Sequence, residues 1–175
     1  MRNFILLMVL SFVTFSCDVP AKQEAEMERA PGFLRAVGEQ INATDASPEN
    51  LDIWDKYIDA HNNRDLELIA SMNIDSTQMG EFRILAPNGQ VIRGSDTQIE
   101  FLKGWFEAEN PTWRTYFSYT MKLDGQNGEW VISGAEVKKT VDGNEVTTYD
   151  VADVYIEDGK IGAFWVYTRA AVPTE

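Results

Sequence analysis

The chain has 175 residues and a formal net charge of -13 at pH 7, because 28 acidic residues outnumber 15 basic ones. A chain this acidic is repelled by nucleic-acid phosphates and by anionic lipid head groups. This argues against nucleic-acid binding and leaves an attached lipid as the expected route to a membrane. With one cysteine and one histidine, the chain lacks the side chains for a disulfide framework, a structural zinc site or a histidine cluster, so we expect neither a metal site nor a cofactor.

The N-terminus has the layout of a secretory signal. A short basic start is followed by an almost unbroken apolar run over residues 4–13, too short to span a bilayer, and Ser16 directly precedes Cys17. A small residue before a cysteine at this place resembles the lipobox of bacterial lipoproteins, although two positions depart from its usual residues, Thr14 and Phe15. The resemblance implies removal of residues 1–16, lipidation of Cys17 and a lipid-anchored protein of the bacterial cell envelope, outside the cytoplasm. A plain signal peptide followed by an incidental cysteine is the alternative.

Residues 17–49 are predicted to form the lipidated cysteine and a flexible tether. The segment is rich in Pro, Glu, Ala and Gln and contains only a short apolar patch. Residues 50–172 are predicted to form one domain, because they carry periodic apolar patterns almost without interruption.

Three helices are predicted in this domain. The first begins at Asn50 and is indicated by residues at i, i+3, i+4 and i+7, which are Trp54, Tyr57, Ile58 and His61. A brief second helix follows from Asp65, its expected N-cap, to about Ser71. The third runs from Gly94 and Ser95 through Ala108 and has a broad apolar face.

The remaining pattern is that of strands. Residues 82–85 and 90–93 flank a Pro-Asn-Gly turn and predict a hairpin. Four longer strands joined by tight turns follow, at residues 115–123, 130–141, 146–157 and 160–169. Helices followed by a long antiparallel sheet predict an α+β domain whose helices cover one sheet face.

Several residues stand in the order and spacing of a known superfamily, namely Trp54, Tyr57, Ala60, Asn63, Asp65, Asp75, Gly94, Asp153, Asp158, Gly159, Lys160 and Ile161. Through them, residues 50–169 resemble the nuclear transport factor 2-like superfamily, which includes ketosteroid isomerases and SnoaL-type polyketide cyclases. The resemblance implies a cone-shaped α+β fold with three helices packed on a curved, mainly antiparallel sheet. It further implies an apolar pocket at one end of the cone and, often, a homodimer formed through the outer sheet surface.

The same resemblance implies a catalytic pair. Tyr57 matches a tyrosine, and Asp153 a buried protonated aspartic acid, that donate hydrogen bonds to an enolate in the isomerases. Asp153 lies between Val151 and Tyr155 on its strand face, where apolar company would raise its pKa and keep it protonated. Asp150 would then face the other way, toward solvent.

The general base of the isomerases has no clear counterpart. The aligned position is close to Gly80, and Glu81, one residue further, falls on the opposite strand face unless a bulge intervenes. His61 is a second candidate, since it is in phase with Tyr57, but a partly charged imidazole stabilised by the end of the helix is the simpler interpretation. Without a base within reach, the isomerase reaction is not supported.

The aromatic residues suggest a ligand cavity, although an aromatic stripe is also typical of an ordinary core. The expected ligand-binding residues are Trp54, Tyr57, His61, Phe101, Trp105, Phe117, Tyr119, Asp153 and Phe164. The sequence therefore favours a membrane-tethered envelope lipoprotein that binds a small apolar or amphipathic molecule or a protein partner without catalysis. A SnoaL-like enzyme acting on a carbonyl compound is the alternative. A third possibility, a purely structural dimerisation module, predicts an interior filled by Trp and Phe side chains.

Overall fold

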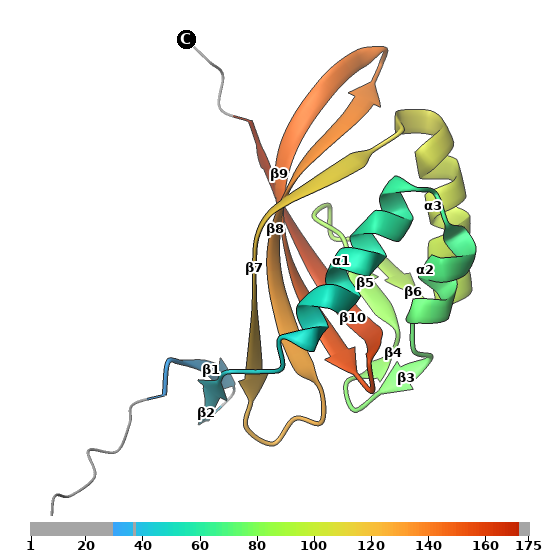
Figure 1. Cartoon of the computed structure of the whole chain (residues 1–175). Coiled ribbons are helices and arrows are strands. Elements are labelled where there is room, and N and C mark those ends of the chain that lie inside the picture. Colours follow the sequence, from blue (N-terminus) through green and yellow to red (C-terminus); the bar gives the residue numbers. More distant parts are fainter. Residues whose placement is uncertain (1–29, 37, 172–175) are drawn as a thin grey trace, which may run out of the picture.

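The structure, a computed structural model, describes residues 30–36 and 38–171. Cys17, the signal segment and the first part of the predicted tether lie outside the described residues. The described chain forms an α+β fold in which a large curved sheet is covered on one side by three helices (Figure 1). The α+β prediction is therefore confirmed.

The helices are α1 (Glu49–Asn62), α2 (Leu66–Met72) and α3 (Ser95–Glu109). The strands are β1 (Gly32–Ala36), β2 (Glu39–Thr44), β3 (Ser76–Thr77), β4 (Gly80–Glu81), β5 (Arg83–Leu85), β6 (Val91–Arg93), β7 (Thr112–Leu123), β8 (Glu129–Val141), β9 (Asn144–Glu157) and β10 (Lys160–Ala170). The hairpin and the four long strands thus form close to their predicted bounds.

The eight strands of the main sheet are ordered β1-β2-β7-β8-β9-β10-β5-β6. All neighbouring strands are antiparallel except β5 and β10, which pair in parallel over Arg83–Leu85 and Ala163–Trp165. The chain thus inserts the β5–β6 hairpin beside its last strand. The parallel pairing of β5 covers only three residues of β10.

Local sequence signals account for the helix ends. The Asp65 side chain accepts a hydrogen bond from the backbone N–H of Leu68 at 2.9 Å, which caps α2 as predicted. Gly94 precedes α3 with a positive φ of 78°, a conformation that favours glycine. Within the described part of the chain, none of the helices has both the length and the apolar character needed to cross a bilayer.

The segment predicted as a tether contains a hairpin that its sequence does not indicate. Strands β1 and β2 pair with each other from Gly32↔Ala43 to Ala36↔Glu39, and β2 joins the main sheet at Ala43↔Leu123 and Thr44↔Lys122. Because these last partners lie nearly 80 residues away in sequence, no local pattern indicates the pairing.

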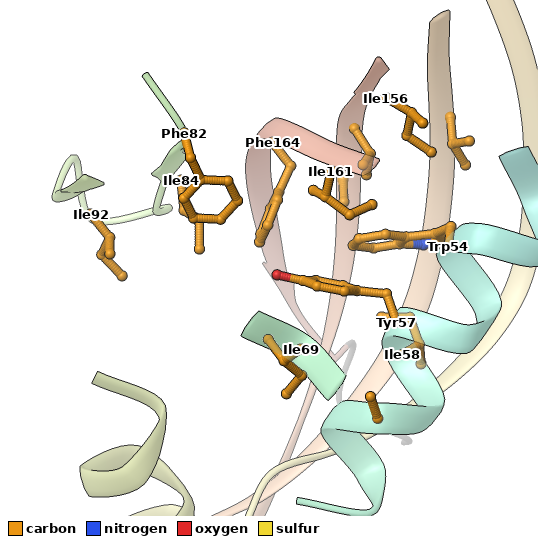
Figure 2. Packing of buried hydrophobic residues seen from close by; sticks show 14 of the residues in the cluster. Trp54, Tyr57, Ile58, Ile69, Phe82, Ile84, Ile92, Ile156, Ile161 and Phe164 are labelled. Carbon is orange, nitrogen blue, oxygen red and sulfur yellow. The ribbon is translucent and has the colours of Figure 1, made fainter. Parts of the chain in front are cut away.

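Both faces of the sheet carry buried apolar clusters. The larger cluster lies between the helices and the sheet, where Trp54 and Tyr57 of α1 lie beside Phe164 and Ile161 of β10 (Figure 2). The smaller cluster lies on the opposite, outer face and contains Ala43, Leu123, Trp130, Tyr155 and Ala163.

Candidate functional site

A cavity of about 510 Å³ lies between the helices and the inner sheet face. Its lining comes from α1, α3, the β5–β6 hairpin and strands β7 to β10. Six aromatic side chains line it: Trp54, Tyr57, Phe101, Trp105, Trp113 and Phe164. Trp54 and Tyr57 of α1 and Phe101 and Trp105 of α3 line the cavity from the helices, whereas Trp113 and Phe164 line it from the sheet.

The structure brings most of the predicted ligand-binding residues to this cavity. Those that line it are Trp54, Tyr57, His61, Phe101, Trp105 and Phe164. Phe117, Tyr119 and Asp153 do not line it, and each has a specific structural reason for lying elsewhere.

Phe117 and Tyr119 were expected on the inner face and lie on the outer one. In β7, Thr115 pairs with Ala135 and Phe117 with Gly134, so Tyr116 is an extra residue that forms a β-bulge. One extra residue reverses which side chains face inward for the rest of the strand. Phe117 and Tyr119 are accordingly 38% and 53% exposed.

The expected Tyr57–Asp153 pair does not form, because Asp153 lies on the outer sheet face. Its strand neighbours Ala152 and Val154 face the helices and belong to the inner cluster. The pKa of Asp153 is raised by partial burial among outer-face residues, and a hydrogen bond with Tyr167 opposes this shift. The prediction of a raised pKa therefore agrees in direction, but the carboxyl is not at the cavity.

Asp150 takes the place in the cavity that was expected for Asp153. It lines the cavity and accepts a hydrogen bond from Thr168 Oγ1 at 2.7 Å. Burial raises the pKa of the Asp150 carboxyl, against the opposing effects of that hydrogen bond and of the Lys139 charge. Three residues apart on a strand, Asp150 and Asp153 must point to opposite faces. Because β9 is largely apolar on both faces, the sequence does not indicate which of the two points inward.

The Tyr57 hydroxyl is committed to two neighbours. It donates to Asn73 Oδ1 at 3.0 Å and accepts from Gln98 Nε2 at 2.7 Å, while Asn73 Nδ2 donates to Gln98 Oε1 at 2.7 Å. The Tyr57 side chain is fully buried, and burial raises the pKa of its hydroxyl. Because its proton already has an acceptor, this hydroxyl has no donor to offer a bound enolate.

This closed network was missed at the sequence level, although one signal for it exists. Gln98 is a polar residue that shares a helix face with Phe101, Leu102 and Trp105 at i, i+3, i+4 and i+7. A polar side chain on an apolar face must find a partner once it is buried. Gln98 does so by joining α3 to α1 and to Asn73 at the end of α2.

His61 lines the cavity as a neutral imidazole. Its Nδ1 lies 2.8 Å from the backbone carbonyl oxygen of Tyr57, and since a carbonyl only accepts, Nδ1 carries the proton. Burial lowers the pKa of His61 to about 4. The expected partly charged imidazole at the helix end is therefore wrong, because desolvation outweighs the attraction of the helix end for positive charge.

An ion pair that the sequence did not indicate also lines the cavity. Lys139 Nζ of β8 lies 2.6 Å from Glu109 Oε2 of α3, and Trp105 Nε1 donates to the same oxygen at 2.9 Å. Hydrogen bonds from Lys139 and Trp105 hold the pKa of Glu109 below its usual value. The contact joins the end of α3 to the sheet.

The proposed general-base position is not part of this site. Glu81 is exposed on β4, its carboxylate lies 4.0 Å from the Arg93 guanidinium, and neither it nor Gly80 lines the cavity. Of the two predicted bases, only His61 reaches the cavity.

No protein-family model matches the chain, and no curated protein matches it in sequence. Solved structures match its fold. A protein described as a SnoaL-like polyketide cyclase from Jannaschia sp. CCS1 has a TM-score of 0.56 at 18% identity, over 71% of this chain and 90% of that one. An LEH-like epoxide hydrolase from M. tuberculosis has a TM-score of 0.56 at 12% identity, over 69% of this chain and 83% of that one.

A third similar structure carries no assigned role. It is an NTF2-like protein of unknown function from Burkholderia pseudomallei, with a TM-score of 0.54 at 16% identity, over 70% of this chain and 92% of that one. At these identities the likenesses establish the fold, which is that of SnoaL-like and NTF2-like proteins, as the sequence resemblance implied.

Proposed function

We propose that this chain is a cell-envelope lipoprotein whose domain holds a small apolar or amphipathic molecule in the cavity between helices and sheet. The observation that carries the proposal is the cavity itself. Its volume of about 510 Å³ lies within the range of small-molecule sites, and its lining combines aromatic rings with a few polar groups. A purely structural module would have filled this space with side chains.

Catalysis through the residues expected from the isomerases is not part of this proposal. The Tyr57 proton is donated to Asn73, and Asp153 faces away from the cavity. His61 is a weak base, because burial lowers its pKa to about 4. Binding therefore accounts for more of the observed geometry than an isomerase reaction does.

A pair of variants on β9 tests the binding site. Ala152→Phe places a ring into the cavity, whereas Val151→Phe places the same ring on the outer face of the same strand. We expect a hydrophobic fluorescent probe to bind the wild-type full chain and Val151→Phe alike, and to bind Ala152→Phe at least about tenfold more weakly. No probe uptake by the wild type, or equal uptake by all three proteins, would remove the proposal.

The membrane tether rests on Cys17 and the preceding apolar run. Lipidation there places the domain outside the cytoplasm, with the lipid rather than the acidic domain surface making the membrane contact. A mass spectrum of the mature protein from its native host should show acyl mass on Cys17. An unmodified N-terminus at another residue would refute the tether.

An enzyme of the SnoaL type is the second candidate function, and Asp150 is the observation that favours it. A carboxyl that lines an apolar cavity and whose pKa is raised by burial is suited to proton transfer. In such an enzyme, the Asp150 carboxylate would take a proton from the carbon next to the carbonyl group of the substrate. Asp150→Asn should abolish turnover of a carbonyl substrate and Asp153→Asn should not, whereas loss of turnover in both or in neither would exclude this assignment.

The outer sheet face is proposed as a homodimer interface. It exposes large side chains in the centre of the sheet, including Phe117, Tyr119 and Tyr167. A contiguous exposed apolar surface of this kind is typical of interaction sites. A protein partner on the same surface is the alternative occupant, and it would leave the chain monomeric in isolation.

A further inference from the structure

The cavity lining contains more acidic groups than positively charged ones. Glu109 and Asp150 contribute two carboxyls, Lys139 contributes one ammonium, and His61 is neutral because burial lowers its pKa to about 4. The Lys139 ammonium lies 2.6 Å from Glu109 Oε2, so these two charges neutralise each other. Asp150 is left as the acidic group without a directly paired cation.

The immediate partners of Asp150 are neutral. Thr168 donates from its hydroxyl at 2.7 Å, and the neutral Thr148 side chain also acts to lower the pKa of the carboxyl. Among the described residues, no Lys, Arg or His nitrogen lies within 4.0 Å of an Asp150 oxygen. A partly buried carboxylate without a directly paired cation is costly to ionise, because the more distant Lys139 charge only partly opposes the effect of burial, and a cation brought in by a ligand would reduce this cost.

The rest of the lining also favours a cation. Six aromatic rings face the same cavity, and the negative faces of aromatic rings attract ammonium groups. Two of them, Trp105 and Trp113, meet edge to face at a centroid distance of 5.4 Å, and Phe101 lies 5.6 Å from Trp105. The net charge of -13 attracts cations to the whole molecule and repels carboxylate ligands.

We infer that the cavity selects an organic amine: a molecule with an apolar or aromatic body that packs against the rings and an ammonium group that pairs with Asp150. The inference rests on the proposed binding function and specifies its ligand class. A neutral ligand would leave the Asp150 carboxylate with no cation closer than Lys139, whose ammonium is paired with Glu109. A carboxylate ligand would add a second unpaired negative charge beside that of Asp150.

Three ligands with the same body test the inference on the wild-type full chain. 4-Phenylbutylamine, 4-phenylbutan-1-ol and 4-phenylbutanoate differ only in the head group, and calorimetric titration at pH 7 gives each dissociation constant. We expect the amine to bind about tenfold or more tightly than the alcohol, and the carboxylate to bind weakest.

Two substitutions in β9 test whether Asp150 is the residue that causes the preference for the amine. In Asp150→Asn, which keeps the shape of the side chain, we expect the amine to lose its advantage and to bind with an affinity similar to that of the alcohol. In Asp153→Asn, on the outer face of the same strand, the preference for the amine should remain. The comparison of the three ligands on the wild type does not depend on the folding of either variant.

The outcomes separate this inference from the function on which it rests. Binding of none of the three ligands would overturn both. Equal binding of amine and alcohol, or tightest binding of the carboxylate, would overturn the amine preference and leave a binding cavity in place. An amine preference that survives in Asp150→Asn would show that Asp150 is not the partner, and it would overturn the inference as well.

Discussion

The two faces of the sheet are similar in composition and different in what covers them. The inner face carries Phe164, Ala152 and Val154 under three helices, around a cavity. The outer face carries Trp130 and Tyr155 in a smaller cluster whose surroundings include half-exposed aromatic rings. The apolar character of a strand face therefore does not by itself determine burial. The layer packed on that face determines it.

The largest expected difference between the faces is in packing energy, and two residues of β10 test it. Phe164 is nearly buried against Trp54 and Tyr57, whereas Tyr167 is 56% exposed on the other face. Phe164→Ala should lower the free energy of unfolding by about 3 to 5 kcal/mol and Tyr167→Ala by less than about 1 kcal/mol. Urea unfolding with unchanged m-values measures both. Equal losses would show that the outer face is covered in solution as the inner one is.

The inner face also carries a pH-dependent cost that comes from His61. Its folded pKa of about 4 lies below the ordinary value of 6.5, so between these pH values the unfolded chain binds a proton that the folded chain does not. Stability should therefore fall as the pH drops from about 6.5 to about 4, by about 3 kcal/mol from this group alone. His61→Gln should lack this part of the pH dependence, because the chain has no other histidine.

Two carboxyls provide the internal contrast to His61. Burial raises the pKa of Asp150 on the inner face and of Asp153 on the outer face. A raised folded pKa means that ionisation of the carboxyl opposes folding. The resulting loss of stability grows as the pH rises above the ordinary value of 3.8 and disappears below it. The free energy of unfolding of the wild type can be measured by urea unfolding at several pH values. A value that increases steadily as the pH falls from about 6.5 to about 4 would contradict the His61 prediction.

A smaller effect is expected from removing one hydroxyl on each face. Tyr57→Phe leaves the Asn73 oxygen without a donor and the Gln98 amide without an acceptor, both of them buried. Unsatisfied buried groups cost about 1 to 3 kcal/mol, so the variant should be less stable by that amount. Tyr119→Phe on the exposed outer face should change the unfolding free energy by less than about 0.5 kcal/mol. A neutral Tyr57→Phe would mean that water replaces the hydroxyl.

The sequence predicted what depends on local patterns. The three helices, the Asp65 cap and the six strands of the hairpin and the meander follow from periodicity and turn residues. Trp54, Tyr57 and His61 reach the cavity because helical spacing places them on one face. The sequence-based prediction failed where one extra residue in a strand changes which side chains face inward. The bulge at Tyr116 turned Phe117 and Tyr119 outward, and bulges depend on pairing with a distant strand.

The remaining errors concern faces and partners that lie far apart in the chain. Asp150 and Asp153 were correctly placed on opposite faces, but β9 has apolar residues on both, so nothing local identified the inner one. The Lys139–Glu109 pair joins residues 30 positions apart, and the Asn73–Gln98 contact residues 25 apart. Such contacts depend on how the layers stack, which periodicity does not encode.

The smallest expected effect concerns dimerisation, which would bury the outer face of the sheet. In a two-fold dimer every substitution occurs twice and can meet its own copy, so Tyr119→Lys would bring two like charges to an apolar interface. Phe117 and Tyr119 stack with ring centroids 6.3 Å apart, which makes this position part of a continuous aromatic surface. Sedimentation equilibrium should show the dimer dissociation constant rise about tenfold or more, equivalent to about 1.4 kcal/mol. Ala108→Lys, which adds the same charge at an exposed site on α3, should leave it unchanged, whereas a wild type that stays monomeric at every concentration would assign the aromatic surface to a different partner.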